Sequence, residues 1–324
     1  MLTALILIPL LGSIILLPIN DTTSFGADRV KKIALIFSLI TFILSIVMWG
    51  EFDSSATGFQ FVQEFNTLSF CHLNVGIDGI SLYFVLLTTF ITPLCLLSNW
   101  DNINYGIKFY MISFLVMESL LITFFVVLDL ILFYVFYEAV LIPMFLVIGI
   151  WGGSNTRVRA TFLLFLYTLA GSLFMLLAIM VIYYNLGTTD FNLLSLNDLS
   201  SNGQKILWLA FFLSFAVKTP LVPFHVWLPR AHAEAPVGGS MLLASLFLKL
   251  ATYGFIRILV GMMPDATSYF SPLVQTIAII TLIYSSLATL RQSDFKALVA
   301  YSSISHMAVV VLAIFSNTIV GIEG

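Results

Sequence analysis

Charge is the scarcest property of this sequence, because Lys, Arg, Asp and Glu make up only 9% of its 324 residues. Soluble domains carry about 25% charged and about 45–50% apolar residues. Here 60% of the residues are hydrophobic, and the mean hydropathy is +1.07. The chain has too few polar residues to cover a water-facing surface. The composition therefore excludes a soluble protein and predicts an integral membrane protein.

Residues that bind metals and nucleotides are also few. The two cysteines, Cys71 and Cys95, belong to no metal-spaced cluster, and the four histidines form no H-E-x-x-H pattern. Neither G-x-G-x-x-G nor G-x-x-x-x-G-K occurs, which are the glycine-rich motifs of dinucleotide and P-loop sites. We therefore expect no cofactor and no metal in this chain.

Long apolar runs without alternation, such as IALIFSLITFILSIVMW (33–49), predict membrane-spanning helices rather than barrel strands. We predict an all-α polytopic membrane protein with about ten transmembrane helices. Their approximate ranges are 1–19, 33–49, 79–98, 109–128, 130–150, 160–184, 206–228, 237–257, 270–290 and 297–316. Charged connections such as DRVKK (28–32) and TRVR (156–159) separate several spans, and the polar segments 50–78 and 185–205 are predicted to be surface loops.

Lys and Arg are unevenly distributed between the two sets of connections. Connections after even-numbered spans hold two basic residues, Lys205 and Arg257. Connections after odd-numbered spans hold nine: Arg29, Lys31, Lys32, Lys108, Arg157, Arg159, Arg230, Arg291 and Lys296. Basic residues favour the cytoplasmic or matrix side of a membrane. The odd-numbered connections are therefore predicted on that side, with both termini on the other.

The most informative charge within a span is Lys218, in SFAVKTPLVPFHVWLPRAHAEAP (214–236). The apolar run 206–217 before it reaches about 18 Å into a hydrocarbon core of ~30 Å. Proline removes a backbone donor and disfavours helix in the residue before it, so Pro220 should release Thr219 from the helix. We expect a discontinuous seventh helix with Lys218 held at mid-depth by helix-terminal carbonyls. The alternative is a proline kink with a lysine that reaches the membrane interface.

Two further charges within spans are candidates for a proton relay. An ionisable group in a membrane costs at least about 2.5–3.5 kcal/mol, so such residues mark function by default. Glu138 lies well inside the fifth span, and a nearby Lys218 would keep its carboxylate charged. Lys249 lies near the middle of the eighth span, after the small residues of GGSMLLAS (238–245) that let helices approach closely. Two lysines in adjacent spans favour a relay over a single site, although either could instead reach the interface.

The remaining candidates have open alternatives. His306 stands in the hydroxyl-rich stretch AYSSISHMAVV, and it is either a relay residue or a hydrogen-bonded core histidine. His225 and His232 flank the broken helix and either extend a proton path or cap loop carbonyls. Glu118 is predicted to be buried, with either a packing or an accessory role. Asp129 lies in a very short turn and is expected near the interface.

Three segments of the sequence resemble a known family. FYVFYEAVLIPMFLVIGIWG (133–152), KTPLVPFHVWLPRAHAEAPVGGSMLLASLFLKLATYGFIRI (218–258) and DFKALVAYSSISHM (294–307) are similar to the antiporter-like membrane subunits of NADH:ubiquinone oxidoreductase, respiratory complex I. GIDGISLYF (76–84) resembles the chain 4 group of that family more than the sister chains 2 and 5. The W-L-P-x-A-H-x-E-A-P pattern is highly specific.

The resemblance implies a function and a set of relay residues. In this family the glutamate at Glu138 pairs with the lysine at Lys218, Lys249 is a central relay residue, and His306 matches a relay histidine. Such subunits translocate protons while NADH, FMN, iron–sulfur clusters and ubiquinone are handled elsewhere in the complex. The expected partners are lipid and other membrane-arm subunits, including chains 2 and 5, without nucleic acid. The 30 phenylalanines, more than a bilayer requires, suggest AT-rich codons and favour the mitochondrial inner membrane.

The sequence departs from the family in length. Members usually have about fourteen spans, built as two inverted five-helix repeats. The resemblance therefore implies N-terminal helices at 1–108, a first repeat at 109–260 with the broken helix, and an incomplete second repeat at 261–324. We expect one half of a split subunit that a separate polypeptide completes. The alternatives are a non-pumping structural remnant and a stand-alone sodium/proton antiporter subunit.

Overall fold

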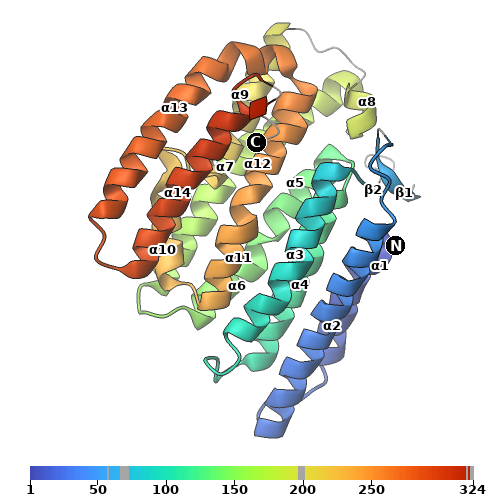
Figure 1. Cartoon of the computed structure of the whole chain (residues 1–324), viewed down its shortest axis with the longest axis vertical. Helices are drawn as coiled ribbons and strands as arrows, with labels where there is room; N and C mark the ends of the chain where they lie inside the picture. The colour runs from blue at the N-terminus through green and yellow to red at the C-terminus, as the bar shows by residue number, and fades with distance from the viewer. Residues whose placement is uncertain (57, 66–72, 196–200, 319, 322–324) are drawn as a thin grey trace. The chain divides into compact units, whose positions relative to one another are not determined.

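Helices form nearly all of the regular structure in the computed structural model, which describes residues 1–324 except 57, 66–72, 196–200, 319 and 322–324 (Figure 1). Within this part of the chain, eight helical runs are long and apolar enough to cross a membrane. They are α2 (Ser24–Gly50), α3 (Gly79–Ser98), α4 (Ile107–Val126), Leu130–Trp151, α7 (Arg157–Leu186), Val237–Val260, α13 (Pro264–Leu290) and α14 (Phe295–Ile314). The chain is a multi-pass membrane protein, as its composition predicts.

Two further predicted spans are present in altered form. The first is a shorter apolar helix, α1 (Leu2–Leu16). The seventh is discontinuous, as predicted: α9 (Ser201–Lys218) ends, a short turn follows, and the chain resumes as η1 (Phe224–Val226) and α10 (Trp227–Glu234).

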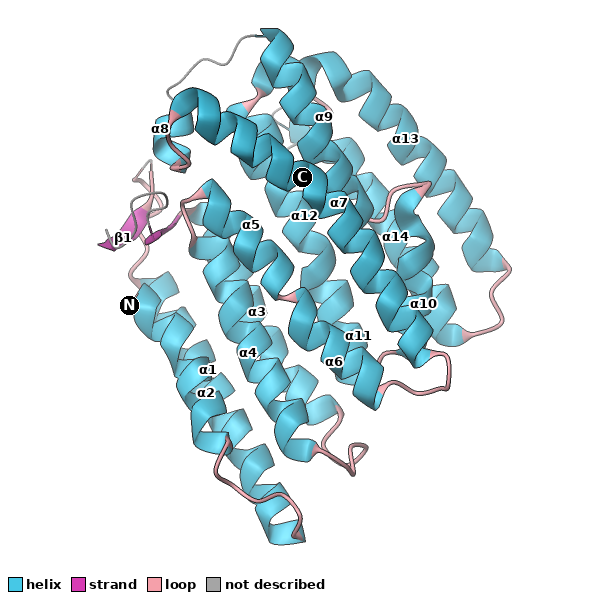
Figure 2. Cartoon of the chain, turned by 180° about the vertical axis from the view of Figure 1, so that it is seen from behind, coloured by secondary structure: helices cyan, strands magenta, loops and turns pink. Residues whose placement is uncertain are grey.

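The fifth span is also interrupted, which the sequence analysis did not predict. It consists of α5 (Leu130–Ala139) and α6 (Leu141–Trp151), with a visible interruption between them (Figure 2). Pro143 has no amide hydrogen to donate to the carbonyl of Ala139, four residues earlier, and this missing bond accounts for the break.

Several predicted connections were wrong. DRVKK lies inside α2, because the side chain of Thr23 accepts a hydrogen bond from the amide of Gly26 and starts the helix early. Most of TRVR lies in the first turn of α7. The predicted loop 50–78 contains an antiparallel pair, β1 (Gln60–Phe65) and β2 (Leu73–Ile77). The predicted loop 185–205 contains the short helix α8 (Phe191–Ser195). Cys71 falls outside the described residues.

The chain divides into two compact units, each described by itself. Unit 1 comprises Met1–Gly152 and Pro236–Leu242, and unit 2 comprises Gly153–Ala235 and Leu243–Gly324. The predicted boundaries at residues 108 and 260 concern the repeats of the family, and they stay predictions.

Unit 1 is built around α4, the most enclosed of its spans, which contacts α1, α2, α3 and α6. The helix α11 (Val237–Leu242) packs against α3. A Cβ atom added at Gly238 would lie 2.7 Å from the carbonyl oxygen of Cys95, so this approach requires glycine. The predicted use of small residues for close helix packing is therefore confirmed at this position.

Unit 2 holds the broken helix. The helix α9 packs against α7, α12 (Leu248–Gly254) and α13, and α10 packs against α7 and α14. The helices α13 and α14 run side by side (Figure 1). The break between α9 and α10 is thus enclosed by neighbouring helices of the same unit.

Candidate proton site at the broken helix

The helix breaks just before Pro220 and Pro223, where the sequence predicts the break. The helix α9 ends at Lys218, and Thr219 leaves helical geometry directly before Pro220. Non-helical backbone at membrane depth is tolerated only where other groups satisfy its hydrogen bonds. Two such bonds close the end of α9: the amide of Leu221 donates to the carbonyl of Ala216 (3.0 Å), and the indole Nε1 of Trp227 donates to the carbonyl of Val217 (2.9 Å).

A side chain from α13 satisfies the turn itself. The amide of Val222 donates to Oγ1 of Thr281 over 3.0 Å, and that hydroxyl in turn donates to the carbonyl of Ile277 over 2.7 Å. Thr281 is fully buried in the middle of α13. Sequence reasoning missed this residue, because a threonine inside an apolar span carries no signal of a distant partner.

Lys218 is buried at the break. Its side chain is only 1% exposed, and Nζ lies 6.0 Å from the ring centroid of Phe247. A lysine that reaches the membrane interface would expose its ammonium group, so the kink-and-reach alternative does not fit this side chain. A buried ammonium group is costly unless a partner stabilises it, which is why such a residue marks a functional site.

His225 lies directly after the turn, in η1, and is also buried. Its ring centroid is 5.0 Å from that of Tyr284 on α13 and 6.4 Å from that of Tyr301 on α14. Within the described part of the chain, its Nδ1 atom has no hydrogen-bond partner. A buried nitrogen of this kind is available to water or to a moving proton. His232, in α10, is buried as well.

Lys249 lies in a second irregular helix. Its helix α12 is bounded by two π-helical segments, η2 (Leu243–Phe247) and η3 (Phe255–Val260). The half-buried ammonium group donates to the carbonyl of Ala244, within η2, over 2.6 Å. Segments of π-helix inside α-helices are frequently found at functional sites. The sequence gives no warning of them, because no proline interrupts this run.

His306 is not buried with Lys218 and His225. Its side chain is exposed on α14. The nearby hydroxyls of Ser302 and Ser305 donate to carbonyls of their own helix, Val299 (2.8 Å) and Ser302 (2.7 Å). The hydroxyl-rich stretch therefore does not surround His306 with polar partners in this chain.

The acidic candidates lie in unit 1. Glu138 is half-buried in the last turn of α5, directly before the interruption of the fifth span. Asp129 is buried and caps α5 by accepting hydrogen bonds from the amides of Ile131 (2.9 Å) and Leu132 (3.1 Å). Because Glu138 and Lys218 belong to different units, their pairing stays a prediction.

Glu118, like Asp129, is fully enclosed. Its side chain is 0% exposed, and neither carboxyl oxygen has a hydrogen-bond partner among the described residues. The choice between a packing role and an accessory role for Glu118 therefore stays open. The described residues contain no group of three or more His, Cys, Asp or Glu side chains placed to hold a metal ion.

Comparisons with known proteins show which family contains a chain of this kind. The membrane family described as NADH:quinone oxidoreductase/Mrp antiporter, TM, matches residues 127–324. The chain is 68% identical to the NADH-ubiquinone oxidoreductase chain 4 of Mycosarcoma maydis over 324 residues. The alignment covers 100% of this chain and 67% of the relative. It is 51% identical to the chain 4 protein of Arabidopsis thaliana, with 100% and 65% covered.

Solved structures agree with this family. A chain of respiratory complex I from Thermus thermophilus with bound NADH matches with a TM-score of 0.87 and 29% identity, covering 99% of this chain and 66% of that one. A chain of an archaeal membrane-bound sulfane sulfur reductase shares the fold, with a TM-score of 0.86 and 22% identity. The chain spans about two thirds of the length of the relatives it matches, 67%, 63% and 65% for three of them.

Proposed function

Because the chain belongs to the NADH:quinone oxidoreductase/Mrp antiporter membrane family, we propose that it is a proton-translocating membrane-arm subunit of a respiratory NADH:ubiquinone oxidoreductase. The observation that carries the proposal is the lysine buried at the end of the broken helix α9, with 1% of its side chain exposed. NADH, FMN, iron–sulfur clusters and ubiquinone belong to other subunits of the proposed complex. The chain couples their electron transfer to proton movement, in the mitochondrial inner membrane.

The proposed working step is a change in the charge that faces Lys218. Glu138 is the proposed counterion, which holds the proton on the lysine while the two charges are close. At 4 Å and an effective dielectric constant of about 20, such a pair attracts by about 4 kcal/mol. Moving one charge against 100 mV costs about 2.3 kcal/mol. Separating the pair therefore changes the affinity of Lys218 for its proton by enough to drive one translocation event.

The released proton is proposed to pass along unit 2. Lys249 and His225 are the next protonatable groups, with His232 as a weaker candidate. His306 becomes an internal relay residue only when a neighbouring helix covers its exposed face of α14. We propose that a separate polypeptide provides this cover, with the other membrane-arm subunits, including chains 2 and 5, as further partners. Mapping the peptides of the purified assembly tests this partner set.

Reconstituted vesicles test the central proposal. The complex that contains this chain is purified, placed in proteoliposomes, and assayed for protons moved per NADH oxidised. We expect Lys218→Ala and Glu138→Ala to assemble, yet to lower proton-coupled quinone reduction. Lys205→Ala is the matched control, because it removes a lysine of the same helix that lies in a predicted connection outside the membrane. Undiminished pumping by Lys218→Ala would refute the proposal.

The two alternatives, a stand-alone sodium/proton antiporter and a non-pumping remnant, are not favoured by the relatives, which are named as chain 4 of the oxidoreductase. Copurification tests the first alternative, because a stand-alone antiporter subunit would not copurify with an NADH-oxidising complex. The vesicle assay separates the second, because a remnant would tolerate the loss of Lys218.

A further inference from the structure

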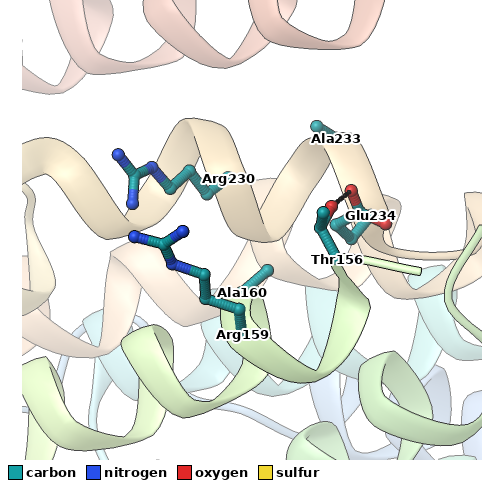
Figure 3. A pocket seen from close by; sticks show the side chains of 6 residues that line it. All are labelled: Thr156, Arg159, Ala160, Arg230, Ala233 and Glu234. Carbon is teal, nitrogen blue, oxygen red and sulfur yellow. Dashed lines mark hydrogen bonds between the residues drawn. The ribbon is translucent and has the colours of Figure 1, made fainter. Parts of the chain in front are cut away.

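A cavity of about 260 Å³ that contains charged side chains lies in unit 2, where the start of α7 meets the last turns of α10 (Figure 3). It is lined by Thr156, Arg159, Ala160, Arg230, Ala233 and Glu234. None of these residues belongs to the proposed proton relay. The cavity therefore needs an explanation of its own.

Two arginines dominate one end of the cavity. Arg159 comes from α7 and Arg230 from α10, and Figure 3 shows their guanidinium groups extending in the same direction and ending beside each other. Neither makes a salt bridge within the described part of the chain. Two adjacent guanidinium groups repel each other unless an anion lies between them. Their planar donors match the oxygens of a phosphate group.

The one carboxylate that lines the cavity, that of Glu234, is hydrogen-bonded to hydroxyl groups at the end opposite the arginines. Glu234 accepts hydrogen bonds from Oγ of Ser154 (2.8 Å) and Oγ1 of Thr156 (2.6 Å). Partial burial raises the pKa of Glu234, but these hydrogen bonds and the positive charge of Lys296 outweigh it and lower the pKa overall. The carboxylate is thus charged and held by hydroxyl groups, so it does not serve as counterion to the arginines.

The cavity lies at the end of unit 2 where the basic connections meet. The amide of Gly153 donates to the carbonyl of Glu234 (2.9 Å), and Nζ of Lys296 donates to the carbonyl of Ala235 (2.9 Å). The starts of α7 and α14 and the end of α10 therefore lie together. All of these connections follow odd-numbered spans, which the distribution of Lys and Arg assigns to the cytoplasmic or matrix side. Basic pockets between helices on that side bind anionic lipid head groups.

A separate apolar groove lies farther along α7. It has a volume of about 370 Å³ and lies between α7 and α9, lined by Leu166, Tyr167, Ala170, Gly171, Phe174, Leu213, Val217 and Phe224. Ala160 of the cavity and Tyr167 and Phe174 of the groove share one face of α7, since their spacing of seven residues is about two helical turns, or about 10 Å. Phe162 and Leu166, 50% and 57% exposed, also lie between the cavity and the far end of the groove.

We propose that the cavity and the groove together bind one anionic phospholipid, with Arg159 and Arg230 on its phosphate and an acyl chain in the groove. A free phosphate ion would satisfy the arginines equally well, because the two ligands share the same recognised group. The groove decides in favour of the lipid, since a soluble anion leaves a long apolar surface beside the cavity unused.

Hydrogen–deuterium exchange of the delipidated complex tests this site without any turnover. Phosphatidylglycerol is titrated into the purified complex in detergent, and protection is followed in peptides covering 153–162 and 227–236. In the wild type we expect saturable protection by phosphatidylglycerol and little by phosphatidylcholine. The double variant Arg159→Gln with Arg230→Gln should raise the half-saturating lipid fraction roughly thirtyfold. Each basic residue contributes about 1 kcal/mol of attraction to an anionic lipid, which is about fivefold in affinity.

The matched control removes two positive charges of the same predicted side whose side chains do not line the cavity. Lys32→Gln with Arg291→Gln should leave the half-saturating fraction unchanged, since both side chains are exposed elsewhere. If the double cavity variant does not assemble, Arg159→Gln alone should show about a fivefold effect. Unchanged lipid affinity in the cavity variants overturns the proposal. Equal protection by inorganic phosphate at the same concentration also overturns it, because the site would then bind a soluble anion.

Discussion

The hydroxyl of Thr281 is the sharpest test of how the broken helix is held. It is the side-chain acceptor for the amide of Val222, at 3.0 Å, in the turn between Pro220 and Pro223. Thr281→Val keeps the shape of the side chain and removes the acceptor. The buried end of α9 stays capped by other groups, so the substitution isolates the turn.

The expected size follows from the geometry of that bond. Leaving a buried donor unsatisfied costs about 1–3 kcal/mol. The amide of Val222 is only partly buried, so we place the cost at about 1–2 kcal/mol, in the lower part of that range. If the turn opens locally, this cost corresponds to roughly 5–30-fold faster amide exchange there.

Hydrogen–deuterium exchange with mass spectrometry on the purified complex measures this directly in peptides covering 219–226. The control is Thr276→Val, on the same helix, whose exposed hydroxyl donates only to the carbonyl of Pro272 (2.8 Å). We expect faster exchange in the Thr281 variant and no change in the control, together with reduced proton pumping by the intact complex. Exchange at 219–226 within twofold of the wild type would refute the assignment of Thr281 as the support of the break.

If Glu138 and Lys218 act as one unit, the double alanine variant should lose no more proton pumping than either single variant, and additive losses would contradict their pairing. Gly254→Ala should lower the melting temperature of the complex, by about 1–3 kcal/mol in stability, because its Cβ would lie 2.5 Å from the ring of Phe215. Glu118→Met should leave thermal stability unchanged or raised, since it removes a buried carboxyl without described hydrogen-bond partners, and a fall in pumping would assign it to proton transfer instead.

The fold class and the break were predictable because they follow from strong local rules. Few residues other than apolar ones can face lipid, so composition alone indicates a membrane protein. Proline acts on its own helix, so Pro220 and Pro223 marked the end of α9 to within one residue of where it lies. The rule is weaker for a single proline: Pro143 coincides with the interruption of the fifth span, whereas Pro93 lies inside the continuous helix α3.

The unpredicted features depend on residues far apart in the sequence or on competing local signals. The support that Thr281 gives to Val222 joins a helix to a turn, through two residues that are 59 positions apart in the sequence. The π-helical segments around Lys249 contain neither proline nor an interrupting glycine pair. The early start of α2 depended on one capping threonine, whose effect outweighed the charged residues read as a connection. The exposure of His306 depends on what covers α14, which no local pattern encodes.

The hydrogen bonds at the break bear on what stabilises the charge of Lys218. The sequence suggested that free carbonyls at the end of α9 stabilise the cation, as helix ends often do. Yet the carbonyls of Ala216 and Val217 already accept hydrogen bonds from the amide of Leu221 and the indole of Trp227. Because these two carbonyls are engaged by other donors, the proposed carboxylate partner, Glu138, is the more effective source of compensating charge for Lys218. A charge that depends on a separate partner can be switched by moving that partner, whereas one held by its own helix end could not, and this dependence is what a proton pump requires.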